Sequence, residues 1–137
     1  METSCKSLIA PSLIDSALKL QIVLLFYRRP RLHSEAWSLS EWLRESPWDI
    51  EEALEALAQI GLLTSTEGPD GRRYHLKPGL EYWAMLERLV VCYDDPERRD
   101  GVYELVRAAQ REQLFRVWLA AEERAKRAEP THWEVVV

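Results

Sequence analysis

The sequence predicts a mainly α-helical fold with one small two-stranded β-hairpin and a helical extension at the C-terminus. Apolar residues recur at helical spacing through most of the chain, whereas residues 62–77 alternate with the period of two that is typical of strands. The letters GPDG at 68–71 mark the hairpin turn. We therefore expect a first domain of residues 1–77 and an extension of residues 78–137.

The composition is that of a globular protein. Hydrophobic residues make up 47% of the chain, which is enough to build an ordinary core, and charged residues make up 30%. The net charge of -5 disfavours a protein whose main task is to grip phosphate. The most apolar run, residues 20–27, is far shorter than the roughly 20 residues that span a bilayer. Cys5 and Cys92 indicate neither a zinc site nor a disulfide framework, so we expect a cytoplasmic protein without a membrane partner.

The first predicted helix runs from about residue 11 to Arg29, where Pro30 ends it. After Leu20 this helix is apolar on nearly every side. A helix of that kind is covered from several directions, so we expect it to lie at the centre of the fold. A basic connector that contains Arg31 and His33 follows it.

Two further helices are predicted before the hairpin. A short helix over residues 38–46 is expected because Ser38 and Glu41 have the spacing of a capping box. Pro47 suits the first turn of the next helix, and Gly61 is placed to close it in a left-handed conformation. The chain then enters the hairpin.

Helical spacing resumes after the hairpin. A helix from Pro78 to about residue 93 is followed by Asp95 and Pro96, which suit the N-cap and first position of the last helix. We expect this last helix to reach about Ala128, with an interruption at Gly101. The terminal letters HWEVVV are β-prone, and three alternatives stay open for them: disorder, packing on the core, or a strand added to the hairpin.

The order of helix, short helix, turn, helix and hairpin over residues 12–78 resembles winged helix-turn-helix transcriptional regulators of the MarR-like and related bacterial type. The best-matched letters are ALEALAQIGLL at 53–63 and GRRYHL at 71–76. The resemblance implies that the third helix enters the major groove of DNA and that the hairpin, the wing, touches the backbone. Winged helices also serve as protein-docking modules, so a protein partner is the alternative.

The third helix lacks the charge of a helix that reads DNA. Ile50, Leu54 and Leu57 recur on one face, which we expect to be buried. The outward residues are Glu51, Glu52, Glu55, Ala56 and Gln59. Three carboxylates would repel phosphates, so we expect double-stranded DNA to be bound weakly, mainly through the connector and wing.

The candidate DNA-binding residues, which are basic except for one amide, are Arg28, Arg29, Arg31, Arg72, Arg73, His75, Lys77 and Gln59. Ordinary solvated surface charge is the alternative for this set. If a protein is bound instead, the candidate residues are Glu51, Glu52, Glu55 and Trp48. For Trp37 and Trp48, either local packing or a role as aromatic anchors stays open. Trp42 and Trp83 lie on apolar stripes and are expected in the core.

Neither catalysis nor a cofactor is expected. The three histidines are scattered, and the chain contains no nucleophile elbow, metal-ligand spacing or glycine-rich phosphate loop. The last helix instead predicts an association surface, because its apolar residues exceed what one chain covers. We expect a homodimer joined through Leu114, Phe115, Val117 and Trp118. The alternative is a monomer whose last helix folds back along its first helix.

Overall fold

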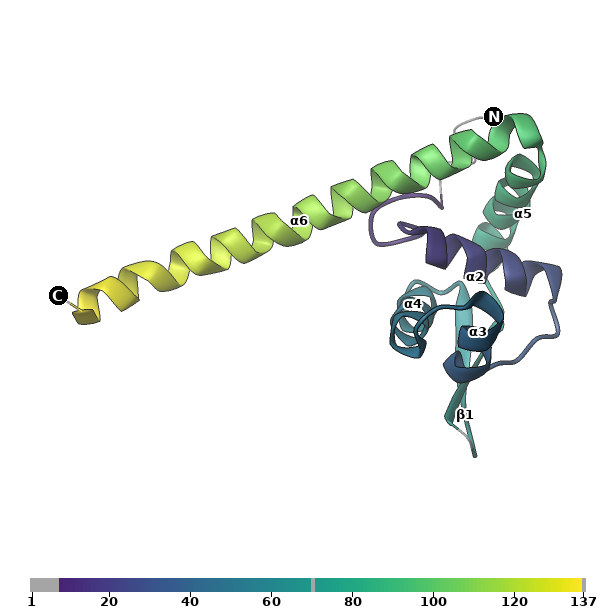
Figure 1. Ribbon diagram of the computed structural model, residues 1–137, viewed down its shortest axis with the longest axis horizontal. Helices are drawn as coiled ribbons and strands as arrows, with labels where there is room; N and C mark the ends of the chain where they lie inside the picture. The colour runs from purple at the N-terminus through teal and green to yellow at the C-terminus, as the bar shows by residue number, and fades with distance from the viewer. Residues whose placement is uncertain (1–7, 70, 137) are drawn as a thin grey trace.

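The computed structural model describes residues 8–69 and 71–136, with side chains through residue 127. Its elements are α2 (Ala17–Arg28), α3 (Ala36–Leu43), α4 (Pro47–Gln59), β1 (Leu63–Gly68), β2 (Gly71–Leu76), α5 (Leu80–Asp94) and α6 (Pro96–Val136). Helices α2 to α5 and the hairpin form one body, from which α6 extends far to one side (Figure 1). The predicted fold class, mainly helical with one antiparallel hairpin, is confirmed.

Helix α2 begins later than predicted. Its N-cap is Ser16, whose hydroxyl accepts a hydrogen bond from the Lys19 amide at 3.2 Å. Upstream, Ser12 has a φ of 72°, a left-handed conformation that does not continue a right-handed helix. The predicted start near residue 11 is therefore wrong, whereas the end before Pro30 agrees with the sequence.

Helix α3 also differs from the prediction. It begins at Ala36 and ends at Leu43, where Arg44 takes a left-handed φ of 55°. Ser38 lies inside the first turn, so the predicted capping box does not form. The cause is tertiary, because the backbone of Ser34 pairs with that of Tyr74 and holds the chain extended just before the helix.

Helix α4 and the hairpin follow the sequence closely. Ser46 caps α4 by accepting from the Trp48 amide at 3.2 Å, and Gly61 closes it with a φ of 91°. Strands β1 and β2 then pair antiparallel from Leu63 opposite Leu76 to Gly68 opposite Gly71. Gly71, at the hairpin turn, has a φ of 119°, a backbone conformation that glycine adopts readily because it has no Cβ.

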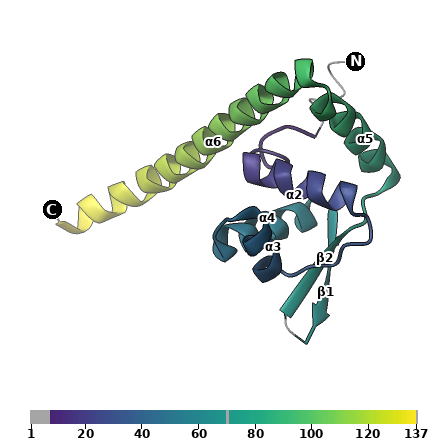
Figure 2. The ribbon, with the colours of Figure 1, turned by 45° about the vertical axis from the view of Figure 1, so that its right-hand side comes forward.

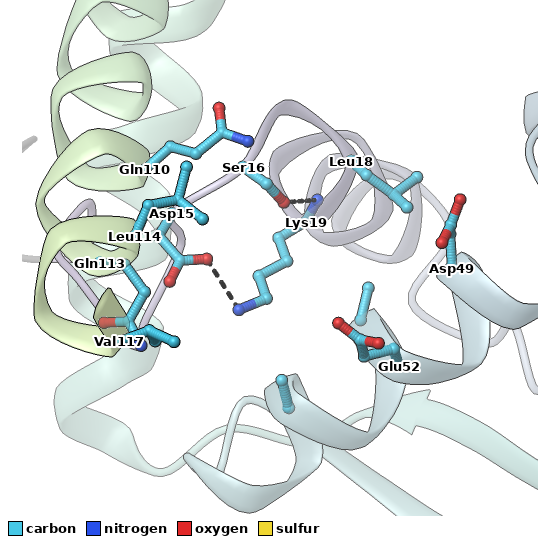
Figure 3. A pocket seen from close by; sticks show the side chains of 12 residues that line it. Asp15, Ser16, Leu18, Lys19, Asp49, Glu52, Gln110, Gln113, Leu114 and Val117 are labelled. Atoms are coloured by element: carbon cyan, nitrogen blue, oxygen red, sulfur yellow. Dashed lines mark hydrogen bonds and ion pairs between the residues drawn. The ribbon is translucent and has the colours of Figure 1, made fainter. Parts of the chain in front are cut away.

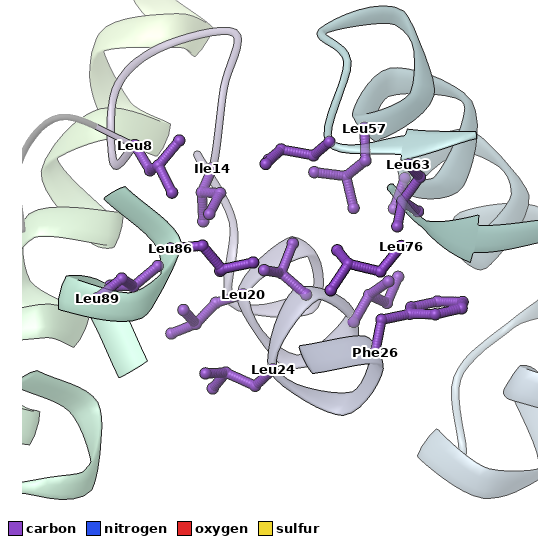
Figure 4. Packing of buried hydrophobic residues seen from close by; sticks show 14 of the residues in the cluster. Leu8, Ile14, Leu20, Leu24, Phe26, Leu57, Leu63, Leu76, Leu86 and Leu89 are labelled. Carbon is purple, nitrogen blue, oxygen red and sulfur yellow. The ribbon is translucent and has the colours of Figure 1, made fainter. Parts of the chain in front are cut away.

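The hydrophobic core surrounds α2, as predicted for a helix without a polar face. Figure 4 shows Leu57, Leu63 and Leu76 from α4 and the hairpin on one side of α2. Leu86 and Leu89 of α5 lie on the other side. The three residues predicted to form the inner face of the third helix are fully buried: Ile50, Leu54 and Leu57.

Two tryptophans predicted in the core lie at the surface. The Trp42 side chain is 56% exposed, and the guanidinium of Arg29 lies over its ring at 4.8 Å. Trp83 is 36% exposed and packs beside Tyr27 with 5.6 Å between ring centroids. For Trp42 the reason is the register of α3, whose buried positions include Leu39 rather than the tryptophan.

The joint between α5 and α6 fixes the direction of the long helix. Asp95 accepts from the Glu97 amide at 3.0 Å, so the predicted cap is confirmed. The hydroxyls of Tyr93 and Tyr103 lie 3.0 Å apart, and the Gln21 amide donates to Tyr103 at 2.8 Å. Helix α6 then passes Gly101 without the predicted interruption.

The C-terminal letters HWEVVV include residue 137, which lies outside the described residues, while the backbone of 132–136 continues α6. The alternative of an added strand is therefore wrong for the described part.

No helix in the ranges 8–69 and 71–136 is both long and apolar enough to cross a membrane. Cys92 is buried and disulfide-bonded, so the expectation of no disulfide is wrong for this residue, and the argument for a reducing compartment loses its support. Cys5 lies outside the described residues.

Candidate functional site

The connector, residues 29–35, lies directly beside β2 (Figure 2). The Ser34 amide donates to the Tyr74 carbonyl at 3.0 Å, and the Tyr74 amide donates back to Ser34 at 2.8 Å. Next to this pair, the rings of His33 and His75 stack with centroids 4.3 Å apart and planes 10° apart. Two basic segments that are far apart in the sequence therefore share one surface.

Two neighbouring hollows extend this surface over α3. One hollow of about 380 Å³ is lined by Arg73, His33 and Trp42 among others, and the next, of about 410 Å³, by Arg29, Arg31 and Trp42. Because Trp42 belongs to both, the cations of the connector and of β2 line adjoining hollows. We call these exposed cations, together with Lys77, whose charge acts on His75, the basic strip: Arg29, Arg31, Arg73 and Lys77.

The cations of the basic strip differ in how they are paired. The Arg73 Nε lies 3.6 Å from a Glu35 carboxylate oxygen, and Arg29 covers the Trp42 ring. Arg31 and Lys77 are exposed and form no ion pair with any described residue. The strip is therefore partly neutralised at Arg73, whereas Arg31 and Lys77, on the other side of the Ser34–Tyr74 pair in both segments, keep their charges unpaired among the described residues.

Two predicted DNA-binding arginines lie away from the strip. Arg28 turns toward α5, where its guanidinium lies 2.7 Å from Asp94, so its part in DNA binding stays a prediction. Arg72 lies 3.2 Å from Glu67 and lines a hollow of about 350 Å³ that faces α4. The alternation of β2 thus separates Arg72 from Arg73, as the period of two predicts.

The outward face of α4 is acidic in the structure as in the sequence. Glu52, Glu55 and Gln59 are exposed. Glu51 instead accepts a hydrogen bond from the Tyr74 hydroxyl at 3.3 Å. Burial, and then the charge of Glu51, raises the pKa of Tyr74. This face can receive cations but has little attraction for phosphate.

Two exposed tryptophans lie in the first turns of α3 and α4. The Trp48 side chain is 84% exposed and that of Trp37 is 68% exposed. The alternative of local packing is therefore wrong for both residues. Exposed aromatic rings beside a charged helix face are typical of protein-binding surfaces.

The histidine stack should make stability depend on pH. Burial, followed by the nearby His33 and Lys77, lowers the pKa of His75 below 6.5, and its buried Nδ1 has no hydrogen-bond partner among the described residues. Because the folded state disfavours the protonated ring, the contribution of His75 is full above pH 6.5 and is lost as pH falls toward the lowered pKa.

We therefore expect His75→Phe, which keeps a stacking ring but cannot titrate, to reduce the loss of stability between about pH 8 and pH 5. Urea unfolding followed by circular dichroism at a series of pH values measures this dependence. Equal pH dependence in the variant and the parent protein would show that the stack does not sense protonation.

A groove that the sequence did not predict lies between α2, α4 and α6. It measures about 510 Å³ and is lined by Asp15 just before α2, by Asp49 and Glu52 of α4, and by Leu114 and Val117 of α6. Figure 3 shows Lys19 reaching across it toward Asp15, with Glu52 on the opposite wall. The only sign of this groove in the local sequence is the four-residue spacing of Asp15 and Lys19, whose side chains form an ion pair at 2.8 Å.

The predicted association surface on α6 is uncovered. The exposed fractions of Leu114, Phe115, Val117 and Trp118 are 63%, 54%, 54% and 54%. Helix α6 contacts the body through its first part, where Val102, Val106 and Ala109 are buried. From residue 114 to residue 127 every side chain of α6 is exposed, and the far part of the helix projects away from the body (Figure 1). This far part therefore does not fold back along α2.

The described residues contain no group of three or more side chains that suits a metal ion. The chain matches no family model, no curated protein and no solved structure. Its function is therefore inferred from the charges and exposed residues described above.

Proposed function

We propose that this protein is a non-enzymatic winged-helix protein of the transcriptional-regulator type that contacts the backbone of double-stranded DNA through the basic strip. The observation that carries the proposal is the pairing of Ser34 with Tyr74. This pairing brings the arginine connector and the wing, strands β1 and β2, onto one surface. Cations that share one surface can contact neighbouring phosphates of the DNA backbone.

The partial neutralisation of the strip fits weak binding. A surface ion pair such as that of Arg73 with Glu35 is worth about 0–1 kcal/mol, so the arginine can exchange its carboxylate for a phosphate. The acidic face of α4 opposes entry into the major groove. The proposed contact is therefore independent of base sequence and depends strongly on salt.

The expected result is duplex DNA binding whose logarithmic salt slope flattens by about one unit in Arg73→Ala, because one phosphate contact is lost. The measurement is fluorescence anisotropy of a labelled duplex over a range of salt concentrations. Arg72→Ala is the matched control, since this neighbouring arginine faces α4. No binding at low salt, or equal effects of the two variants, would contradict the proposal.

A second candidate function is protein docking through the acidic face of α4. The exposure of Trp48, at 84%, favours it. The disulfide at Cys92 indicates an oxidising compartment, and such a compartment favours protein docking over DNA contact. The two functions respond oppositely to one change. Replacing Glu52 and Glu55 with Gln strengthens binding to DNA by removing repulsion and weakens binding to a basic protein.

We also propose that the molecule is a homodimer joined through the exposed part of α6. Leu114, Phe115, Val117 and Trp118 are uncovered within one chain, and a two-fold pair is the commonest way to bury such a surface. The dimer would hold two basic strips at a fixed separation, as DNA-binding dimers do.

A further inference from the structure

The groove between α2, α4 and α6 has an unbalanced negative charge. Its lining includes three carboxylates, Asp15, Asp49 and Glu52, against the single ammonium of Lys19. Lys19 is held by Asp15 at 2.8 Å. Asp49 and Glu52 are exposed, and neither forms an ion pair with a described residue. Two carboxylates at the mouth of the groove are thus available to a cation from outside.

One wall of the same groove is part of the proposed dimer surface. Val117 and Leu114 line the groove and are more than half exposed, and Gln110 lines it about two turns before Val117 on α6. A helix that covers Val117 in a dimer must therefore pass along the mouth of the groove.

The far end of α6 carries a cation on the matching face. Arg124 follows Val117 by seven residues, which is close to two helical turns, so the two side chains share one face. Lys126 follows Val117 by nine residues, which places it on the opposite face. Arg124 is exposed and forms no ion pair with a described residue.

We infer that the groove is the docking site for the α6 helix of a second copy of this chain, whose Arg124 enters it and pairs with Asp49 and Glu52. In an antiparallel pair centred on Val117, a residue seven positions after the centre meets one seven positions before it. Arg124 of the second copy therefore lies opposite Gln110, about 10 Å from the centre along the helix. This inference rests on the proposed homodimer and specifies its register.

A second copy accounts for more of the surface than an unrelated basic segment does. The helix side that carries the exposed Leu114 and Val117 also carries the complementary cation Arg124. Two-fold symmetry forms the contact twice, because each chain offers one groove and one Arg124. The groove is thus completed by the partner.

The test uses the full chain in sedimentation equilibrium at several concentrations. Arg124→Glu and Glu52→Arg are each expected to raise the dimer dissociation constant by about tenfold or more, because each places like charges together. The double variant with both changes restores the ion pair and should return the constant close to that of the parent protein. Lys126→Glu is the matched control, with the same change of charge on the opposite helix face.

The outcomes separate the register from the dimer itself. If Trp118→Glu splits the dimer while Arg124→Glu acts no more strongly than Lys126→Glu, the docking inference is overturned and the homodimer stands. Failure of the double variant to recover also overturns the inference. A parent protein that sediments as a monomer at every concentration overturns both.

Discussion

Leu54→Ala is expected to lower the free energy of unfolding by roughly 2–5 kcal/mol, because a fully buried leucine leaves a cavity when its side chain is shortened. Leu54 has no exposed surface and lies on the face of α4 that packs against α2. Urea unfolding followed by circular dichroism measures the change.

Leu80→Ala is the matched control for this prediction. The Leu80 side chain is 92% exposed at the start of α5, so the same substitution should change stability by no more than about 0.5 kcal/mol. Equal unfolding midpoints for the two variants would contradict the position of α4 in the core.

Trp118→Glu is expected to convert a dimer of two 16.0 kDa chains into a monomer. The reason is that an interface core does not tolerate an unpaired carboxylate. Sedimentation equilibrium at micromolar concentration distinguishes the two species. The control is Trp48→Glu, which makes the same change at an exposed tryptophan on α4 and should leave the dimer intact. A variant that stays dimeric would place the interface elsewhere.

The elements that could be predicted from sequence are those whose limits are set locally. Helix α4 agrees closely because its cap at Ser46 and its closing glycine, Gly61, act within a few residues of the helix. The separation of Arg72 from Arg73 also follows from strand alternation alone. Such features depend on neighbours in the chain.

The features that could not be predicted depend on distant segments. Helix α3 starts early because Ser34 pairs with Tyr74 across the fold, and the helix buries Ala36, Leu39 and Ser40, which leaves Trp42 at the surface. Arg28 leaves the predicted cluster because Asp94 reaches it from α5. The acidic groove was missed for the same reason, since its walls come from three helices.

The most direct test of the proposed DNA contact is an NMR titration of the full chain with a short DNA duplex at low salt. The basic strip predicts that the largest changes in backbone amide shifts occur around Arg31, Arg73 and Lys77, and that added salt reverses them. Largest changes on the face of α4 that carries Glu52 and Glu55, or no changes anywhere in the chain, would contradict the proposal.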